Sequence, residues 1–175
     1  DFRWGKDENT DDTEGVLLSK KKEESCGISE KEIEIDALRI MSTMSAYLSA
    51  LGKEKRSVNT GMLAGNGTIR ASVKGYASGK LSKEELHQVW KAVEEALSAG
   101  ALGISLGIAY APEFEYDRDE LVEALQPLKG TDIPITTHIR NEGDGILLAL
   151  QEVISVAEEL QIPLHVSHMK CIGRK

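Results

Sequence analysis

Two histidines stand at the ends of short apolar runs, where their side chains could bind a metal ion. His138 ends one such run and His168 ends the next, and a long cation stands two positions later in each case, Arg140 and Lys170. Adjacent parallel strands lie roughly 4.8 Å apart. Imidazoles at matching strand ends can therefore share one zinc ion, through zinc–nitrogen bonds of about 2.0–2.1 Å. The alternative, that both histidines are only polar strand ends, is about equally well supported by this pattern alone.

The other two histidines fit a ligand role less well. Side chains alternate along a strand, so His165 is expected to point away from the face that His168 uses. His87 falls on a helix beside its apolar stripe, where a surface or boundary position is expected.

Arg140 and Glu142 follow His138 closely in the sequence. They can form a pair that orients the ligand or its loop from outside the coordination sphere. A plain surface ion pair, which contributes little to stability, explains them equally well.

These residues must be positioned by an alternation of helices and strands that begins near residue 30. Helices are predicted at 38–51, 82–99, 117–126 and 143–160, and strands at 58–64, 101–106, 133–138 and 163–168. Ser82 and Glu85 form a capping box for the second helix. Asp117 caps the third helix, which Pro127 should end. A turn is expected at Gly65-Asn66-Gly67.

Strands that recur every 30 to 40 residues with helices between them indicate βαβ units and a parallel sheet. A doubly wound sheet and a (β/α)₈ barrel both satisfy this pattern. Four strands are about half of a barrel, and the chain starts at Asp1 and stops soon after His168. We therefore expect residues 31–175 to be a fragment of a larger barrel. Residues 1–30 are polar and without clear periodicity, which is typical of a loop or poorly ordered segment.

Composition excludes several classes of protein. The chain has 175 residues, of which 41% are hydrophobic and 29% are charged, as in ordinary globular domains. A net charge of -8 argues against a nucleic-acid or anionic-membrane surface, which needs clustered Lys and Arg. No stretch approaches the length of a membrane span. Cys26 and Cys171 form no disulfide framework, so we expect a reduced, cytoplasmic setting, with Cys171 a small residue beyond the last strand.

Four collinear segments carry a resemblance to a known family. They are Ala99 to Gly107 (AGALGISLG), Tyr110-Ala111-Pro112, Thr137 to Gly143 (THIRNEG) and Ser167-His168-Met169-Lys170. Together they resemble the N-acyl-D-amino-acid deacylases (D-aminoacylases) of the amidohydrolase superfamily. The resemblance runs from about residue 36 to the end of the chain, and four motifs in the family's order make it specific, whereas any one motif alone would be weak. The turn at Gly65 to Arg70 is also similar, with Asn66 where many members carry His.

The resemblance implies a metal-binding (β/α)₈ barrel that hydrolyses the amide bond of small N-acyl-D-amino acids. It implies that His138 and His168 are zinc ligands from successive strands. It also implies that Lys170 holds the substrate carboxylate and that Tyr110 lines the same pocket. Cys26 resembles the family's cysteine ligand in Ser25-Cys26-Gly27, although a charged segment precedes it here instead of an apolar strand.

Two parts of the family's site have no counterpart in this sequence. The chain contains no His-x-His pair, and no residue matches the aspartate that transfers protons in the family. We therefore expect this chain alone to be inactive. A ring-opening amidohydrolase of the dihydroorotase or hydantoinase kind, and a non-catalytic α/β domain, remain open as alternatives. The oligomeric state is left undetermined.

Overall fold

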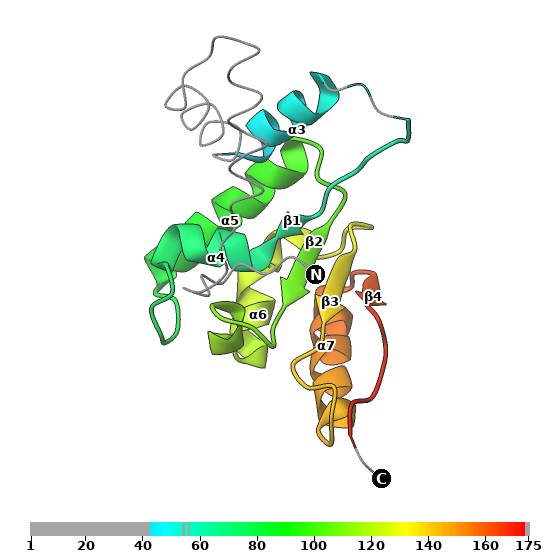
Figure 1. Cartoon of the computed structure of the whole chain (residues 1–175). Helices are drawn as coiled ribbons and strands as arrows, with labels where there is room; N and C mark the ends of the chain where they lie inside the picture. The colour runs from blue at the N-terminus through cyan, green and yellow to red at the C-terminus, as the bar shows by residue number, and fades with distance from the viewer. Residues whose placement is uncertain (1–42, 54, 56, 174–175) are drawn as a thin grey trace, which may run out of the picture. The chain divides into compact units, whose positions relative to one another are not determined.

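The computed structural model describes residues 43–53, 55 and 57–173, shown in colour in Figure 1. Cys26, the polar segment 1–30 and the first part of the helix expected at 38–51 lie outside the described residues. None of the helices in the described ranges is both long and apolar enough to cross a membrane.

Four parallel strands form an open sheet whose order in space is their order in sequence. They are β1 (Ala64–Gly65), β2 (Ile104–Gly107), β3 (Ile135–His138) and β4 (Leu164–Val166). The register pairs Ile104 with Ile135 and Ile135 with Leu164. Sequential parallel neighbours joined through helices are the arrangement found in part of a (β/α)₈ barrel.

Helices separate the strands along the chain (Figure 1). They are α3 (Met44–Lys53), α4 (Asn66–Lys74), α5 (Lys83–Ser98), α6 (Arg118–Ala124) and α7 (Ile146–Leu160), with short 3-10 turns η1 (Glu113–Glu115) and η2 (Gln126–Leu128). The predicted capping box is present: Ser82 accepts from the Glu85 amide, and Glu85 accepts from the Ser82 amide. Asp117 caps α6 through the Glu120 amide.

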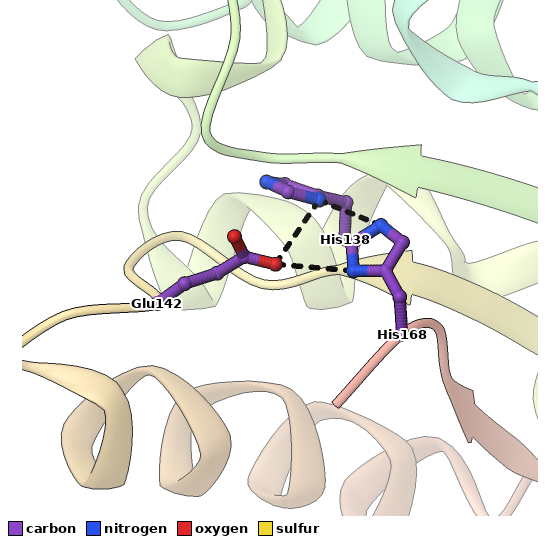
Figure 2. A group of neighbouring side chains, drawn as sticks. All are labelled: His138, Glu142 and His168. Carbon is purple, nitrogen blue, oxygen red and sulfur yellow. Dashed lines mark hydrogen bonds and ion pairs between the residues drawn. The ribbon is translucent and has the colours of Figure 1, made fainter. Parts of the chain in front are cut away.

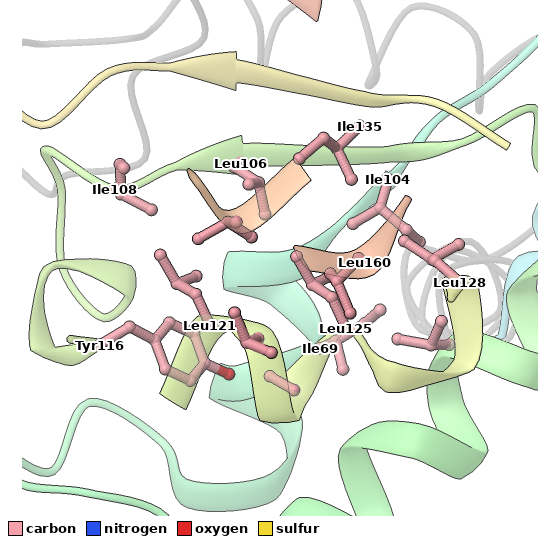
Figure 3. Packing of buried hydrophobic residues seen from close by; sticks show 14 of the residues in the cluster. Ile69, Ile104, Leu106, Ile108, Tyr116, Leu121, Leu125, Leu128, Ile135 and Leu160 are labelled. Carbon is pink, nitrogen blue, oxygen red and sulfur yellow. The ribbon is translucent and has the colours of Figure 1, made fainter. Parts of the chain in front are cut away.

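One face of the sheet carries the hydrophobic core. Ile104, Leu106 and Ile135 point to that face and are buried against the helices (Figure 3). Burying a side chain of this size contributes about 1.5–3 kcal/mol. Because side chains alternate along a strand, Thr136 and His138 point to the opposite face and are only partly buried. The core therefore fixes the direction in which His138 projects.

The structure differs from the sequence prediction at the start of the sheet. The strand expected at 58–64 is reduced to β1, and Val58 is 71% exposed. The segment expected to be a turn at Gly65 to Gly67 instead opens helix α4 at Asn66. The helix expected to end at residue 51 continues to Lys53. Of the residues expected in that strand at 58–64, only Ala64 lies in a described strand.

Candidate metal centre

His138 is the last residue of β3, at the carboxyl edge of the sheet. It pairs in register with Gly107, the last residue of β2. Gly107 has no side chain, and the Glu113 carboxylate and the Tyr110 ring lie close to the position that a Cβ would take. The side chain of His138 is 18% exposed.

His168 lies two residues beyond β4, in a turn that redirects its side chain. Its φ of 37° is in the left-handed region that non-glycine residues seldom adopt. The pairing of β3 and β4 continues up to this point, since the Ser167 amide donates to the Thr137 carbonyl at 2.9 Å. The turn, and not the alternation of a continuing strand, therefore decides where His168 points.

The two imidazoles meet as the sequence predicted. Nδ1 of His138 lies 3.0 Å from Nε2 of His168, and the ring centroids are 4.7 Å apart (Figure 2). Two nitrogens that bind one tetrahedral zinc at about 2.0–2.1 Å lie about 3.4 Å from each other. The observed separation is close to that value, so these nitrogens fit a shared metal ion.

Glu142 reaches the same point from the loop that follows β3 (Figure 2). Its Oε1 lies 3.1 Å from Nδ1 of His168 and 3.6 Å from Nδ1 of His138. The three side chains offer ligand atoms that all lie within 4.8 Å of one another. The Glu142 side chain is 10% exposed, so its carboxylate is largely removed from water.

The protonation of His138 suits metal binding. Burial lowers the pKa of His138 below its ordinary value, and the neighbouring Glu142 carboxylate opposes that change. The electrostatic effects of His168 and Lys170 also lower the pKa of His138. The neutral imidazole is therefore favoured near pH 7, and the neutral form is the one that binds metal ions.

Tyr110 and Lys170 lie beside the histidines. The Tyr110 ring centroid is 4.9 Å from that of His138, with the planes tilted by 32°, and Tyr110 is 61% exposed. Lys170 places its Nζ 3.4 Å from Oε2 of Glu142. The structure thus brings both predicted substrate-binding residues to the carboxyl edge where the histidines meet.

Arg140 and Glu142 take different partners. The ion pair between them that the sequence allowed is not among the interactions of the described residues. Arg140 binds Glu152 of α7 and donates to the carbonyls of Ile108, Phe114 and Tyr116. Glu142 faces His168 and Lys170 instead. The two side chains leave the loop in different directions, which residue spacing alone does not specify.

The remaining histidines and Cys171 stand apart from this group. His165 pairs in register with Thr136 and therefore lies on the same sheet face as His138, one pleat further from the carboxyl edge. His165 is therefore separated from the site by its distance along the strand. It does not point to the opposite face of the sheet, as strand alternation had led us to expect. His87 is exposed on α5 and contacts Trp90, and Cys171 is exposed.

A buried polar pair near this edge had no signal in the sequence. Glu113 is 6% exposed, accepts from the Gly107 amide at 2.6 Å and accepts from Nδ2 of Asn66 at 2.8 Å. Burial raises the pKa of Glu113, although these hydrogen bonds and the Arg70 charge oppose the rise. Asn66, which occupies the position where the resemblance expects His, holds this carboxyl from 47 residues away. Such long-range partners leave no periodic trace in a sequence.

Comparison with known proteins shows which proteins this chain resembles in sequence. No family model matches the chain. The chain is 34% identical over 128 residues to a D-aminoacylase of Alcaligenes xylosoxydans xylosoxydans, covering 73% of this chain and 26% of the relative. It is 33% identical over 135 residues to an N-acyl-D-aspartate deacylase of the same organism, covering 77% of this chain and 27% of the relative. The chain thus spans about a quarter of the length of the curated relatives it matches.

Solved structures give the same result. A D-aminoacylase crystal structure, described as defining a novel subset of amidohydrolases, superposes with a TM-score of 0.70 at 33% identity, covering 75% of this chain and 28% of that one. The N-acyl-D-glutamate deacylase of Bordetella bronchiseptica, solved with zinc and a phosphonate inhibitor, superposes with a TM-score of 0.71 at 29% identity, covering 74% and 27%. These similarities confirm the predicted resemblance and the predicted fold class, part of an amidohydrolase barrel.

Proposed function

We propose that this chain, a relative of the N-acyl-D-amino-acid deacylases of the amidohydrolase superfamily, carries part of a zinc site that hydrolyses the amide bond of N-acyl-D-amino acids. The observation that supports it best is the 3.0 Å approach of Nδ1 of His138 to Nε2 of His168. Two ring nitrogens from neighbouring strands meet at the carboxyl edge of a parallel sheet, which is where barrel enzymes form their active sites.

His138 and His168 would hold the zinc ion, and we propose Cys26 as a third ligand from the segment outside the described residues. The donor set fits, because imidazole nitrogens and a thiolate are the ligands that zinc prefers. A bound zinc ion supplies Lewis acidity, which polarises an amide carbonyl and lowers the pKa of water.

The chain's own residues also suit the substrate. Lys170 is a compact cation beside the histidines and would pair with the α-carboxylate of an N-acyl-D-amino acid. Tyr110 would line the same pocket, because its ring lies against His138 and most of its surface is exposed. Both side chains are open to solvent at the edge where an acyl group would enter.

We propose that the chain alone does not complete the reaction. Amide hydrolysis needs a group that takes a proton and returns it to the leaving amine. In the family that the chain resembles, an aspartate transfers this proton, and the resemblance matches none of the described residues to it. The described sheet also has four strands, whereas a (β/α)₈ barrel has eight. We propose a cytoplasmic location, in keeping with the two cysteines.

The decisive experiment assays the product of the complete gene with zinc. N-acetyl-D-glutamate, N-acetyl-D-aspartate and N-acetyl-D-methionine are the substrates, with their L-enantiomers as controls, and release of free amino acid is measured. Hydrolysis of a D-substrate that is lost in His138→Ala supports the proposal. Turnover of dihydroorotate in place of these compounds would support the ring-opening alternative. Absence of turnover of all four compounds would support a non-catalytic domain. Turnover by the 175-residue chain itself would contradict its proposed inactivity.

A further inference from the structure

Glu142 contacts a metal-binding histidine and the substrate-binding lysine with different oxygens of one carboxylate. Oε1 lies 3.1 Å from Nδ1 of His168, and Oε2 lies 3.4 Å from Nζ of Lys170. His168 and Lys170 both follow β4 and stand two positions apart, whereas Glu142 comes from the loop after β3. One side chain therefore connects the two parts of the proposed site.

The orientation of His168 decides what Glu142 does. Nε2 of His168 faces His138, and Nδ1 of the same ring faces Glu142 (Figure 2). A ligand histidine commonly binds the metal through one nitrogen and donates its other N–H to a carboxylate, which fixes the tautomer and the ring orientation. The contacts at His168 match that arrangement.

The backbone holds Glu142 in place for this role. Its carbonyl accepts from the Ile172 amide at 2.6 Å, which ties the loop after β3 to the segment after β4. Its side chain is 10% exposed, so water competes little for the carboxylate. A largely buried carboxylate needs charged or donor partners. Among the described residues, the ion pairs and hydrogen bonds of this carboxylate are those with His138, His168 and Lys170.

We infer that Glu142 is a positioning residue that holds His168 with Nε2 free for zinc and, through its second oxygen, holds Lys170 beside the metal centre. The inference rests on the proposed function for the identity of the metal and the role of Lys170. It assigns to Glu142 two separable effects, because a hydrogen-bond acceptor is enough for His168 whereas Lys170 needs a negative charge.

Two substitutions separate these effects in the 175-residue chain. Glu142→Ala removes both, and Glu142→Gln keeps an acceptor oxygen for His168 but removes the charge. Asp144→Asn is the matched control, since Asp144 is an exposed carboxylate two positions further along the same loop. Zinc affinity is measured by competition with a chelator, and ring protonation of His168 is read from long-range ¹H–¹⁵N correlation spectra.

In the unsubstituted chain, we expect zinc on Nε2 of His168 and a proton on Nδ1. We expect Glu142→Ala to weaken zinc binding by about 10–100-fold and to give a mixture of His168 tautomers. Glu142→Gln should retain the tautomer and most of the affinity, while the Nζ resonance of Lys170 shifts as in Glu142→Ala. Asp144→Asn should change none of these.

Three results would overturn the inference. Zinc bound through Nδ1 of His168 would place the metal on the side of Glu142 and make Glu142 a direct ligand. Unaltered His168 spectra in Glu142→Ala would show that Glu142 does not position His168. Absence of zinc binding by the unsubstituted chain would remove the metal centre that Glu142 is inferred to support. None of these measurements requires amide hydrolysis. A failure here is therefore distinguishable from a failure of the deacylase proposal, which is decided by turnover of the complete gene product.

Discussion

Arg140 and Glu152 form a two-point ion pair that fixes the loop after β3 to helix α7. Nε of Arg140 lies 3.0 Å from Oε2 of Glu152, and Nη2 lies 2.9 Å from Oε1. The remaining guanidinium donors reach three backbone carbonyls in the segment between β2 and α6. One side chain thus joins β3, α7 and the loop that carries Tyr110.

Arg140→Lys should destabilise the fold by about 1–3 kcal/mol, because a single ammonium cannot reproduce the planar fork or satisfy the carbonyls. The free energy of unfolding is measured with urea. Arg118→Lys is the control on α6, where partly exposed ion pairs should contribute less than about 1 kcal/mol. Equal losses in the two variants would contradict the special role of Arg140.

Glu113 should make stability fall as pH rises. Burial holds the pKa of Glu113 above its ordinary value, so the folded chain binds this proton more tightly than the unfolded chain. The resulting stabilisation is present in acid and is lost between the ordinary and the raised pKa. Glu113→Gln should remove that loss, so its stability relative to the unsubstituted chain should improve from pH 4 to pH 8 in urea titrations. If the difference in unfolding free energy between Glu113→Gln and the unsubstituted chain does not vary with pH, Glu113 does not have a raised pKa in the folded chain.

Gly103 is required by the close approach of β2 and β3. A Cβ at this position would meet the Pro134 carbonyl oxygen, which accepts from the Ile104 amide at 3.1 Å. Gly103→Ala should therefore cost about 1–3 kcal/mol through forced backbone displacement. Gly52→Ala is the control, since a Cβ there meets nothing within 4 Å inside α3, and it should stabilise the helix by about 0.5–1 kcal/mol. Similar unfolding midpoints for the two variants would contradict the steric argument.

His168→Ala should reduce zinc affinity at least 10-fold, because the proposed ligand set loses one imidazole. His165→Ala removes the same group from the neighbouring strand position and should leave the affinity within about 2-fold, since that ring lies one pleat away from the edge. Isothermal titration of the metal-free chain with zinc makes the comparison. A larger loss of zinc affinity in His165→Ala than in His168→Ala would show that His168 is not the metal ligand from this segment.

Lys170→Met should raise KM in the complete gene product without lowering kcat in proportion. Loss of a charge-assisted contact to the substrate carboxylate weakens binding by about 1.5–3 kcal/mol, which corresponds to about 10–150-fold. Lys91→Met, an exposed lysine of α5, is the matched control and should leave both constants unchanged. An unchanged KM in Lys170→Met would remove Lys170 from the substrate site.

Much of the fold could be predicted from the sequence because the relevant signals are local. Helical periodicity and the caps at Ser82 and Asp117 identify α5 and α6, and apolar runs identify β3 and β4. The positions of His138 and His168 at the ends of those runs made a shared metal ion one of two equally supported interpretations, and the structure brings the two rings together. The strand expected at 58–64 is longer than β1, because two paired residues leave no detectable period. The helix that begins at Asn66 was missed because Gly65-Asn66-Gly67 has the composition of a turn.

By itself, the sequence determined which residues lie at the carboxyl edge, since strand direction and order follow from the βα alternation. Only the tertiary structure decided which of those residues touch. Glu142 faces His168 and Arg140 faces Glu152, although the spacing allowed the two to pair with each other. His168 reaches His138 through a turn of positive φ that strand alternation does not include. The physical reason is that loop side chains take their direction from backbone turns and long-range partners, and neither is encoded in the local spacing of residues.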